Sequence, residues 1–244
     1  MNGKERFIKM GSMLYKMKKI KTSKKVKDYR YWEMRRRDDP EKDWDYGEET
    51  WLDGYIKSVE HPHRKLIGDA LVKFYPFGGI LEIGCGVGAN LIRLAVYTNI
   101  IGTDQELFPE TKLTGTDVNR DSLNIAKEML PRAIFKIGNV TSLPFEDKSF
   151  DVVICDAVLI YVGPDEIEKA LSEIDRVVRK YIIFVERFDE SLEGKVRGYV
   201  WARNYTKLLE NFGFKVEEQS ITKEVWPTSK NWVKYGRLFI AVRQ

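Results

Sequence analysis

The sequence is poor in the residues from which covalent and metal-centred scaffolds are built. Its 244 residues include two cysteines and two histidines, too few for a disulfide framework or a Cys/His metal cluster. It also lacks an uninterrupted apolar run of the roughly 18 residues that cross a bilayer, and its start lacks the pattern of a signal peptide. We therefore expect a soluble, cytoplasmic protein without a bound metal.

An excess of positive charge is concentrated in the N-terminal part of the chain. The net charge is +4, but the first 37 residues carry 14 Lys or Arg against three acidic residues. Apolar residues at three- and four-residue spacing within residues 1–27 fit an amphipathic basic helix, and a disordered extension is the alternative. A basic segment of this kind suits contact with nucleic acid or with an anionic membrane. Both are therefore candidate partners of residues 1–37.

From residue 61 onward, apolar stretches of strand length alternate with stretches of helical periodicity. This alternation predicts an α/β fold around a mostly parallel sheet. Residues 28–60 combine polar residues with seven aromatic ones and are expected to form a lid over a pocket. We divide the chain into a basic tail (1–27), a lid segment (28–60) and one α/β domain (61–244). The predicted strands are 79–83, 112–116, 133–137, 150–155, 181–186, 214–220 and 237–242, and the predicted helices include 120–130, 164–178 and 200–212.

A glycine-rich turn follows the first predicted strand. Gly84, Gly86 and Gly88 stand between this strand and the next helix, where the lack of side chains lets a ligand approach the backbone closely. A nucleotide-like cofactor suits such a turn. Gly84, Gly86 and Ala89 also satisfy the dinucleotide fingerprint, so a nicotinamide cofactor remains an alternative. Glu82, two residues before the first glycine, favours a cofactor with a cationic amino group over one with a pyrophosphate.

The stretch LEIGCGVG at 81–88 resembles the Glu-x-Gly-x-Gly-x-Gly motif of class I (Rossmann-like) S-adenosylmethionine-dependent methyltransferases. Further matching motifs follow in the order expected for that family, and the resemblance covers about residues 61–242. It implies a doubly wound, seven-stranded, mostly parallel sheet with an antiparallel C-terminal strand, and S-adenosylmethionine as the cofactor. In this turn, the cofactor contacts that the resemblance implies are Glu82, Gly84, Cys85 and Gly86.

In this family an acid at the end of the second strand binds the ribose hydroxyls, and the chain offers two look-alike candidates. Asp104 and Asp117 each follow a Gly-Thr pair. Asp104 has the commoner distance from the glycines, but only Asp117 is followed at once by a helical pattern. We select Asp117, with its neighbour Val118, as the ribose-binding pair. Residues 98–110 then become an insertion in the preceding loop.

The stretch from Gly138 to Val153 resembles the segment that cradles adenine in this family. Asn139 stands where the family usually has Asp, and its amide oxygen is expected to accept a hydrogen bond from the exocyclic amine. Val140 is expected to supply backbone contacts and apolar area. A connecting loop without a ligand is the alternative interpretation.

Family resemblance places the transferred methyl group near the end of strand 150–155. Asp156 is expected to contact the cofactor's amino group or the acceptor, with backbone capping as the alternative. Tyr161 stands where relatives often have His, and core packing is its alternative role. His61 and Arg64 flank the start of a helix beside the lid. His61 is a candidate for removing a proton from the acceptor and Arg64 for holding a carboxylate, or both belong to an exposed helix start.

The resemblance implies transfer of a methyl group from S-adenosylmethionine to an oxygen or nitrogen atom of an acceptor. Holding the acceptor and the methyl group in near-attack geometry supplies roughly 7–11 kcal/mol, so the sequence need not reveal a base. A small-molecule acceptor is favoured, because no Asn-Pro-Pro-Tyr type of base-methylating motif follows residues 150–155. The alternatives are a nicotinamide-dependent oxidoreductase and an RNA- or lipid-associated methyltransferase that uses the basic tail.

Overall fold

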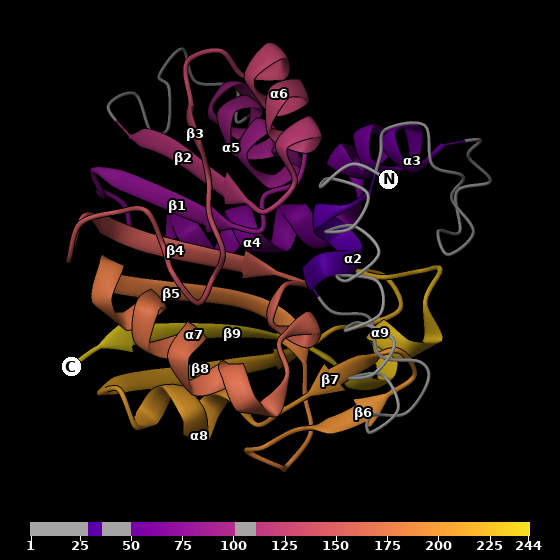
Figure 1. Ribbon diagram of the computed structural model, residues 1–244, viewed down its shortest axis with the longest axis vertical. Coiled ribbons are helices and arrows are strands. Elements are labelled where there is room, and N and C mark those ends of the chain that lie inside the picture. The colour runs from indigo at the N-terminus through magenta and orange to yellow at the C-terminus, as the bar shows by residue number, and fades with distance from the viewer. Residues whose placement is uncertain (1–28, 36–49, 101–110) are drawn as a thin grey trace, which may run out of the picture.

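The computed structural model describes residues 29–35, 50–100 and 111–244, and its centre is a seven-stranded sheet in the order β3-β2-β1-β4-β5-β9-β8 (Figure 1). The strands from β3 to β5 pair in parallel, whereas β9 runs antiparallel to both β5 and β8. The predicted doubly wound sheet with an antiparallel C-terminal strand is therefore confirmed. The strands are β1 (Gly79–Ile83), β2 (Lys112–Asp117), β3 (Ile134–Ile137), β4 (Phe150–Asp156), β5 (Val178–Arg187), β8 (Phe214–Ser220) and β9 (Gly236–Arg243).

Helices cover both faces of the sheet, so its central strands are buried on both sides. In β1, Leu81 and Ile83 pack into one hydrophobic cluster with α7 (Pro164–Val177), whereas Ile80 packs into the opposite cluster with α4 (Pro62–Val72). This two-sided burial explains why the central strands read as continuous apolar runs rather than as alternating patterns. The other helices of the domain are α5 (Ala89–Ile100), α6 (Arg120–Met129), α8 (Tyr205–Glu210) and α9 (Lys230–Tyr235).

The order of the strands creates a topological switch point between β1 and β4. The chain winds outward from β1 through β2 to β3 and then returns to place β4 on the other side of β1. In open α/β sheets a ligand binds at such a point, beyond the carboxyl ends of the strands. In Figure 1 the carboxyl ends of β1, β2 and β4 point toward the side where the lid helices α2 (Tyr29–Glu33) and α3 (Trp51–Lys57) lie.

The predicted helix 200–212 is wrong at its start. Val200–Ala202 forms β7, which pairs with β6 (Lys195–Arg197) in a two-stranded hairpin. The helix α8 begins only after Asn204, whose side chain caps it by accepting a hydrogen bond from the backbone N–H of Lys207. Apolar residues 200–202 satisfy the helical period, but Asn at the N-cap is the stronger local signal for where a helix starts.

The boundary between α7 and β5 also differs from the prediction. The helix predicted over 164–178 ends at Val177, and β5 follows directly from Val178, three residues before the predicted strand start at Tyr181. The two adjacent valines fit the end of an apolar helix face and the start of a buried strand equally well. Tertiary pairing with β4 and β9 settles the choice.

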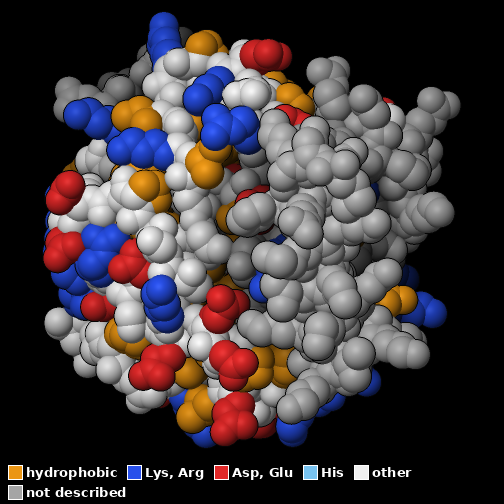
Figure 2. All heavy atoms as spheres, in the orientation of Figure 1, with side chains coloured by type: hydrophobic (Ala, Val, Ile, Leu, Met, Phe, Trp, Pro, Cys, Tyr) orange, Lys and Arg blue, Asp and Glu red, His pale blue; other side chains and the backbone are white. Residues whose placement is uncertain are grey.

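The basic tail, part of the lid and the insertion lie partly or wholly outside the described residues. Residues 1–28, 36–49 and 101–110 belong to this set, and it includes Asp104. The tail's binding to nucleic acid or membrane therefore stays a prediction, as do the domain boundaries. On the face shown in Figure 2, Lys and Arg side chains stand beside Asp and Glu side chains over the described surface. Within the described ranges, every helix is too short or too polar to cross a membrane.

Candidate functional site

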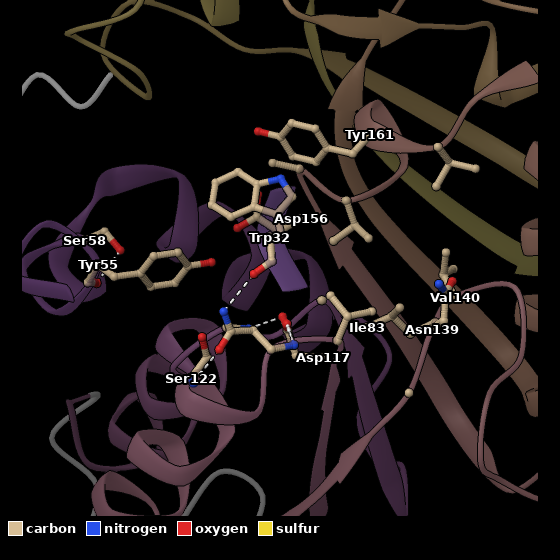
Figure 3. Close-up of a pocket in the computed structure, with 18 of the residues that line it drawn as sticks. Trp32, Tyr55, Ser58, Ile83, Asp117, Ser122, Asn139, Val140, Asp156 and Tyr161 are labelled. Atoms are coloured by element: carbon tan, nitrogen blue, oxygen red, sulfur yellow. Dashed lines mark hydrogen bonds between the residues drawn. The ribbon is translucent and has the colours of Figure 1, made fainter. Parts of the chain in front are cut away.

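A cavity opens at the switch point, between the carboxyl edge of the sheet and the lid (Figure 3). Its open space, including the mouth, measures about 1110 Å³. Of the residues selected from the sequence, those that line it are His61, Gly84, Gly86, Asp117, Val118, Asn139, Val140, Asp156 and Tyr161. Lining residues outside that selection include Trp32, Tyr55, His63, Asn119 and Trp226.

The glycine turn holds the cavity floor in a shape that only glycine permits. Gly84 and Gly86 have φ angles of +67° and +54°, in the left-handed region where a side chain is costly. A Cβ atom at Gly84 would lie 2.4 Å from Val158 Cγ2, and one at Gly86 would lie 2.7 Å from the Tyr55 ring. The Gly84 N–H donates to the Thr116 carbonyl oxygen at 2.7 Å, which ties the turn to the end of β2.

Asp117 fixes the relation between the glycine turn and the start of α6. One of its carboxylate oxygens accepts the Gly86 N–H and the other accepts the Asn119 N–H, both at 2.8 Å. Each oxygen retains a further lone pair for a ligand hydroxyl. Asp117 ends β2, which pairs in parallel with β1, so the choice of 112–116 as the second strand is confirmed, with one further residue at its end. Its ribose contact stays a prediction.

Asn119 joins the lid to the domain. Its side-chain nitrogen donates to the carbonyl oxygens of Trp32 and Arg35 at 2.7 and 2.8 Å, while its side-chain oxygen caps α6 through the Ser122 N–H. The indole of Trp32 then packs edge-on against Tyr161, with ring centroids 5.2 Å apart. In Figure 3 the two rings lie next to each other, on the opposite side of the cavity from Asp117.

At the expected adenine end, Asn139 is oriented differently from the prediction. Its side-chain oxygen accepts hydrogen bonds from the backbone N–H and the hydroxyl of Thr141, at 3.0 and 3.1 Å. Both lone pairs of the oxygen are therefore engaged within the turn, and the NH₂ group is what the side chain offers to a ligand. Asn139 can thus donate to an adenine ring nitrogen rather than accept from its amine. Val140 lies beside it, 8% exposed.

A buried polar network lies at the other end of the cavity, around Asp156. Its Oδ2 atom accepts from His63 Nε2 at 2.9 Å, Asn90 Nδ2 at 2.9 Å and Arg64 Nη1 at 3.3 Å. Asn90 Nδ2 also donates to Glu82 Oε1 at 2.8 Å. Among the described residues, no partner reaches Asp156 Oδ1, Glu82 Oε2 or Asn90 Oδ1. Asp156 Oδ1 and Asn90 Oδ1 are thus buried acceptors without donors, and they are suited to a cationic group because buried polar atoms require hydrogen-bond partners.

Two of the residues selected from the sequence do not line the cavity. Glu82 lies behind it, 3% exposed, and is connected to it through Asn90 and Asp156. Cys85 turns its side chain into the core cluster that contains Leu123 and Phe135, and its Sγ is the atom that a Cβ at Gly115 would meet. Cys85 contributes its backbone to the turn, through a 3.1 Å bond to the Thr116 carbonyl oxygen.

The pKa of Glu82 makes the stability of the protein depend on pH. Burial raises this pKa from 4.5 to about 8, against the hydrogen bond from Asn90. Between these values the folded state holds a proton that the unfolded chain has lost, so this contribution to stability declines as pH rises and is gone above about 8. His61 and His63 have lowered pKa values, so their contribution has the opposite sign and is complete by about pH 6.5.

We therefore expect Glu82→Gln to change the pH dependence of stability between pH 6.5 and 8. The wild-type free energy of unfolding should fall there relative to that of the variant by up to about 1.4 kcal/mol per pH unit, the value for one proton. Urea denaturation of both proteins at several pH values measures this difference. Parallel curves would show that Glu82 is ionised in the folded state throughout the range.

The loop that carries Tyr161 is held by two buried polar side chains, those of Glu186 and Arg203, from opposite sides. The carboxylate of Glu186 accepts the N–H groups of Val158, Leu159 and Ile160 at 2.9, 2.8 and 3.1 Å. Arg203 donates to the carbonyl oxygens of Leu159 and Val162 at 3.2 and 2.6 Å. Both side chains are 0% exposed. They position the short helix η2 (Leu159–Tyr161) at the cavity wall.

This fold, with its glycine turn, the acid at the end of β2 and the cavity at the switch point, is the fold of class I (Rossmann-like) methyltransferases. Residues 80–181 match the model of a methyltransferase domain family. The match is to methyltransferases and does not favour the nicotinamide-dependent alternative.

Relatives with known sequences agree with this assignment. The chain is 30% identical over 105 residues to an uncharacterized methyltransferase of Schizosaccharomyces pombe, a match covering 41% of this chain and 36% of that protein. It is 29% identical over 143 residues to phthiotriol/phenolphthiotriol dimycocerosates methyltransferase of Mycobacterium tuberculosis, covering 56% and 48% of the two chains. The chain thus spans less than half of the length of either relative.

A solved structure shows the same fold over most of the chain. Magnesium protoporphyrin IX methyltransferase from Synechocystis PCC 6803, crystallised with bound SAH, superposes with a TM-score of 0.57. The two are 19% identical, and the superposition covers 81% of this chain and 90% of that one.

Proposed function

We propose that the protein is an S-adenosylmethionine-dependent methyltransferase that acts on an oxygen or nitrogen atom of a small-molecule acceptor. The observation that carries this proposal is the pairing of two acidic ends in one cavity. Asp117 stands at the end that suits a ribose, and the buried acceptors around Asp156 stand at the end that suits an amino-acid ammonium group. A nicotinamide dinucleotide offers no ammonium group to this second end, because the pyridinium cation of its oxidised form has no N–H to donate.

The residues present fit the cofactor along its whole length. The amide of Asn139 and the side chain of Val140 line the wall expected to hold adenine, and Asp117 lines the wall next to it. Asp156 and Asn90 would receive the ammonium group, with the side chain of Glu82 behind them as the hydrogen-bond partner of Asn90. When bound, S-adenosylmethionine supplies an electrophilic methyl group on a sulfonium, which is a good leaving group.

The chain's own contribution is to hold the acceptor in line with that methyl group. Trp32, Tyr161 and Trp226 form apolar walls around the part of the cavity next to Asp156. Ordering an acceptor there supplies an effective-concentration advantage of roughly 7–11 kcal/mol. Aromatic faces also stabilise the positive charge that a methylated nitrogen would carry.

A small-molecule acceptor is supported by the form of the site. The cavity lies under the lid helix α2, held there by Asn119, and its walls are largely aromatic and aliphatic. Two methyltransferases similar to this chain are named for a lipid and for a porphyrin as acceptors. We therefore propose an acceptor with a substantial apolar part. Screening lipid and porphyrin acceptors with labelled S-adenosylmethionine tests this, and transfer only to RNA or protein would contradict it.

Calorimetric titration with S-adenosylhomocysteine tests the cofactor assignment. Asp117 and Asp104, which each follow a Gly-Thr pair, provide a matched pair of variants. We expect Asp117→Ala to weaken binding by about 10- to 150-fold, because hydrogen bonds to a charged group contribute about 1.5–3 kcal/mol. Asp104→Ala should leave the affinity unchanged. If Asp104→Ala abolishes binding and Asp117→Ala does not, the choice between the two acids is reversed. If the wild-type protein binds neither form of the cofactor, the proposed function is wrong.

A further inference from the structure

We propose that Asp156, His63 and His61 form a proton relay, in which His61 removes the proton from a neutral hydroxyl or amine acceptor and His63 carries the resulting charge beside Asp156. The inference rests on the proposed function and adds a substrate class to it. It implies an acceptor that must lose a proton, in contrast to one that is already anionic, such as a carboxylate.

The three side chains form a continuous hydrogen-bonded chain. Asp156 Oδ2 lies 2.9 Å from His63 Nε2, and His63 Nδ1 lies 2.5 Å from His61 Nδ1. His63 is 3% exposed and His61 is 8% exposed, so both rings are largely shielded from bulk solvent. All three residues line the cavity.

The carboxylate at one end fixes the position of every proton along the chain. An ionised Asp156 only accepts, so His63 Nε2 must carry a hydrogen. A neutral His63 then has a bare Nδ1, which requires that His61 Nδ1 donates to it. The lone pair of His61 consequently sits on Nε2. This is the tautomer needed for His61 to take a proton from an acceptor.

When His61 takes up a proton from the acceptor, it passes its own Nδ1 proton on to His63. The acceptor's proton goes to His61 Nε2, and the proton on His61 Nδ1 moves to His63 Nδ1. The new bond joins the acceptor atom to the methyl carbon, and the sulfur–carbon bond breaks with its electron pair remaining on sulfur. The positive charge lost at sulfur reappears on His63, next to Asp156, and is later released to solvent as a proton.

A weak contact in the structure fits this second state. The backbone N–H of His63 lies 3.4 Å from His61 Nδ1, which is long for a hydrogen bond. It caps α4 only when His61 Nδ1 has a lone pair. That condition holds after the proton has moved to His63. When His63 is protonated, the hydrogen bond between the two Nδ1 atoms is reversed, and His61 Nδ1 also becomes the acceptor for the backbone N–H of His63.

The surroundings keep the relay neutral at rest. Among the described residues, the charged groups that act on the two histidines from packed elements are Asp156 on β4 and Arg64 on α4, while Trp226 stacks on the His63 ring at 4.4 Å. Burial, the charge of His63 and the charge of Arg64 lower the pKa of His61 to about 3. Burial also lowers the pKa of His63, and Asp156 opposes that effect. Positive charge is therefore better stabilised on His63 than on His61.

The chain offers a direct test, since His61 and His63 are its two histidines. Long-range ¹H–¹⁵N NMR of the full-length, histidine-labelled protein with S-adenosylhomocysteine reports the tautomer of each ring. We expect His63 protonated on Nε2 and His61 protonated on Nδ1 at neutral pH. In Asp156→Asn the constraint on His63 is removed, and both rings should change their tautomer populations.

Two results would overturn the relay. One is a His61 ring protonated on Nε2 at neutral pH, and the other is a pair of tautomers that Asp156→Asn leaves unchanged. The binding of S-adenosylhomocysteine to the wild-type protein, measured by calorimetry on the same sample, separates the two failures. Normal binding with the wrong tautomers rejects the relay alone, whereas no binding rejects the proposed function.

Discussion

Replacing Asp156 with alanine is expected to lower the free energy of unfolding by about 3–5 kcal/mol, the cost of breaking a buried ion pair by removing one partner. The carboxylate is the acceptor for His63, Arg64 and Asn90 at once. The side chains of Arg64 and Asp156 are 6% and 7% exposed, so water cannot replace the lost contacts. Hydrogen bonding to these donors lowers the pKa of Asp156 against the effect of burial, which keeps it ionised.

Asp147→Ala is the matched control for Asp156→Ala. Asp147 also forms an ion pair, with Arg176 at 2.8 Å, but its side chain is 75% exposed. Exposed pairs contribute about 0–1 kcal/mol. Chemical denaturation of both variants measures the difference. Equal losses of stability would show that Asp156 does not compensate the buried cation of Arg64.

The affinity for S-adenosylhomocysteine should fall together with stability in Asp156→Ala. Removal of one charge-assisted hydrogen bond to the ammonium group is expected to weaken binding by about 10- to 150-fold. Asp156→Asn keeps the shape of the side chain and should lose less stability than Asp156→Ala while losing similar affinity. Such a pattern would separate the charge of Asp156 from its packing.

Glu186→Ala is expected to have the second large effect, a loss of about 3–5 kcal/mol in the free energy of unfolding. The substitution leaves three backbone N–H groups of residues 158–160 without an acceptor in a buried position, and each unsatisfied group costs about 1–3 kcal/mol. Partial rearrangement of the loop keeps the total below the sum. Because this loop carries Val158 and Tyr161 into the cavity wall, the affinity for S-adenosylhomocysteine should also fall.

The exposed Glu168 on α7 provides the reference for Glu186. Glu168→Ala should change stability by no more than about 0.5 kcal/mol, as is usual for surface substitutions. Thermal and urea denaturation measure the stability of both variants, and calorimetry measures their affinity for S-adenosylhomocysteine. If Glu186→Ala unfolds at the same urea concentration as the wild type, the three hydrogen bonds do not determine the position of the loop.

Several residues of the site could not have been selected from the sequence. Asn119 looks like an ordinary N-cap of α6, and its second role, holding two carbonyl oxygens of the lid, depends on residues more than 80 positions away. Glu186 and Arg203 look like charged residues at the ends of elements. A weak signal existed for Glu186, because an acid that ends an apolar strand at the carboxyl edge of a parallel sheet stands where ligands and loops meet.

Three of the selected residues that line the cavity share a different property. Gly84, Gly86 and Asp117 belong to local motifs whose function depends on the backbone conformation of a few adjacent residues. Local sequence determines such a conformation. His61 lines the cavity as expected, but its connection to Asp156 runs through His63, which the sequence marked only as a neighbour.

The sequence by itself determined the alternation of strands and helices, the glycine turn and the acid that ends β2, because each follows from periodicity or from short-range backbone constraints. Only the tertiary structure decided which charges meet. Glu82, Asn90 and Asp156 come from β1, α5 and β4, and α2 is joined to the start of α6 through Asn119. A hydrogen bond between distant residues depends on how whole elements pack, and no local pattern encodes that packing.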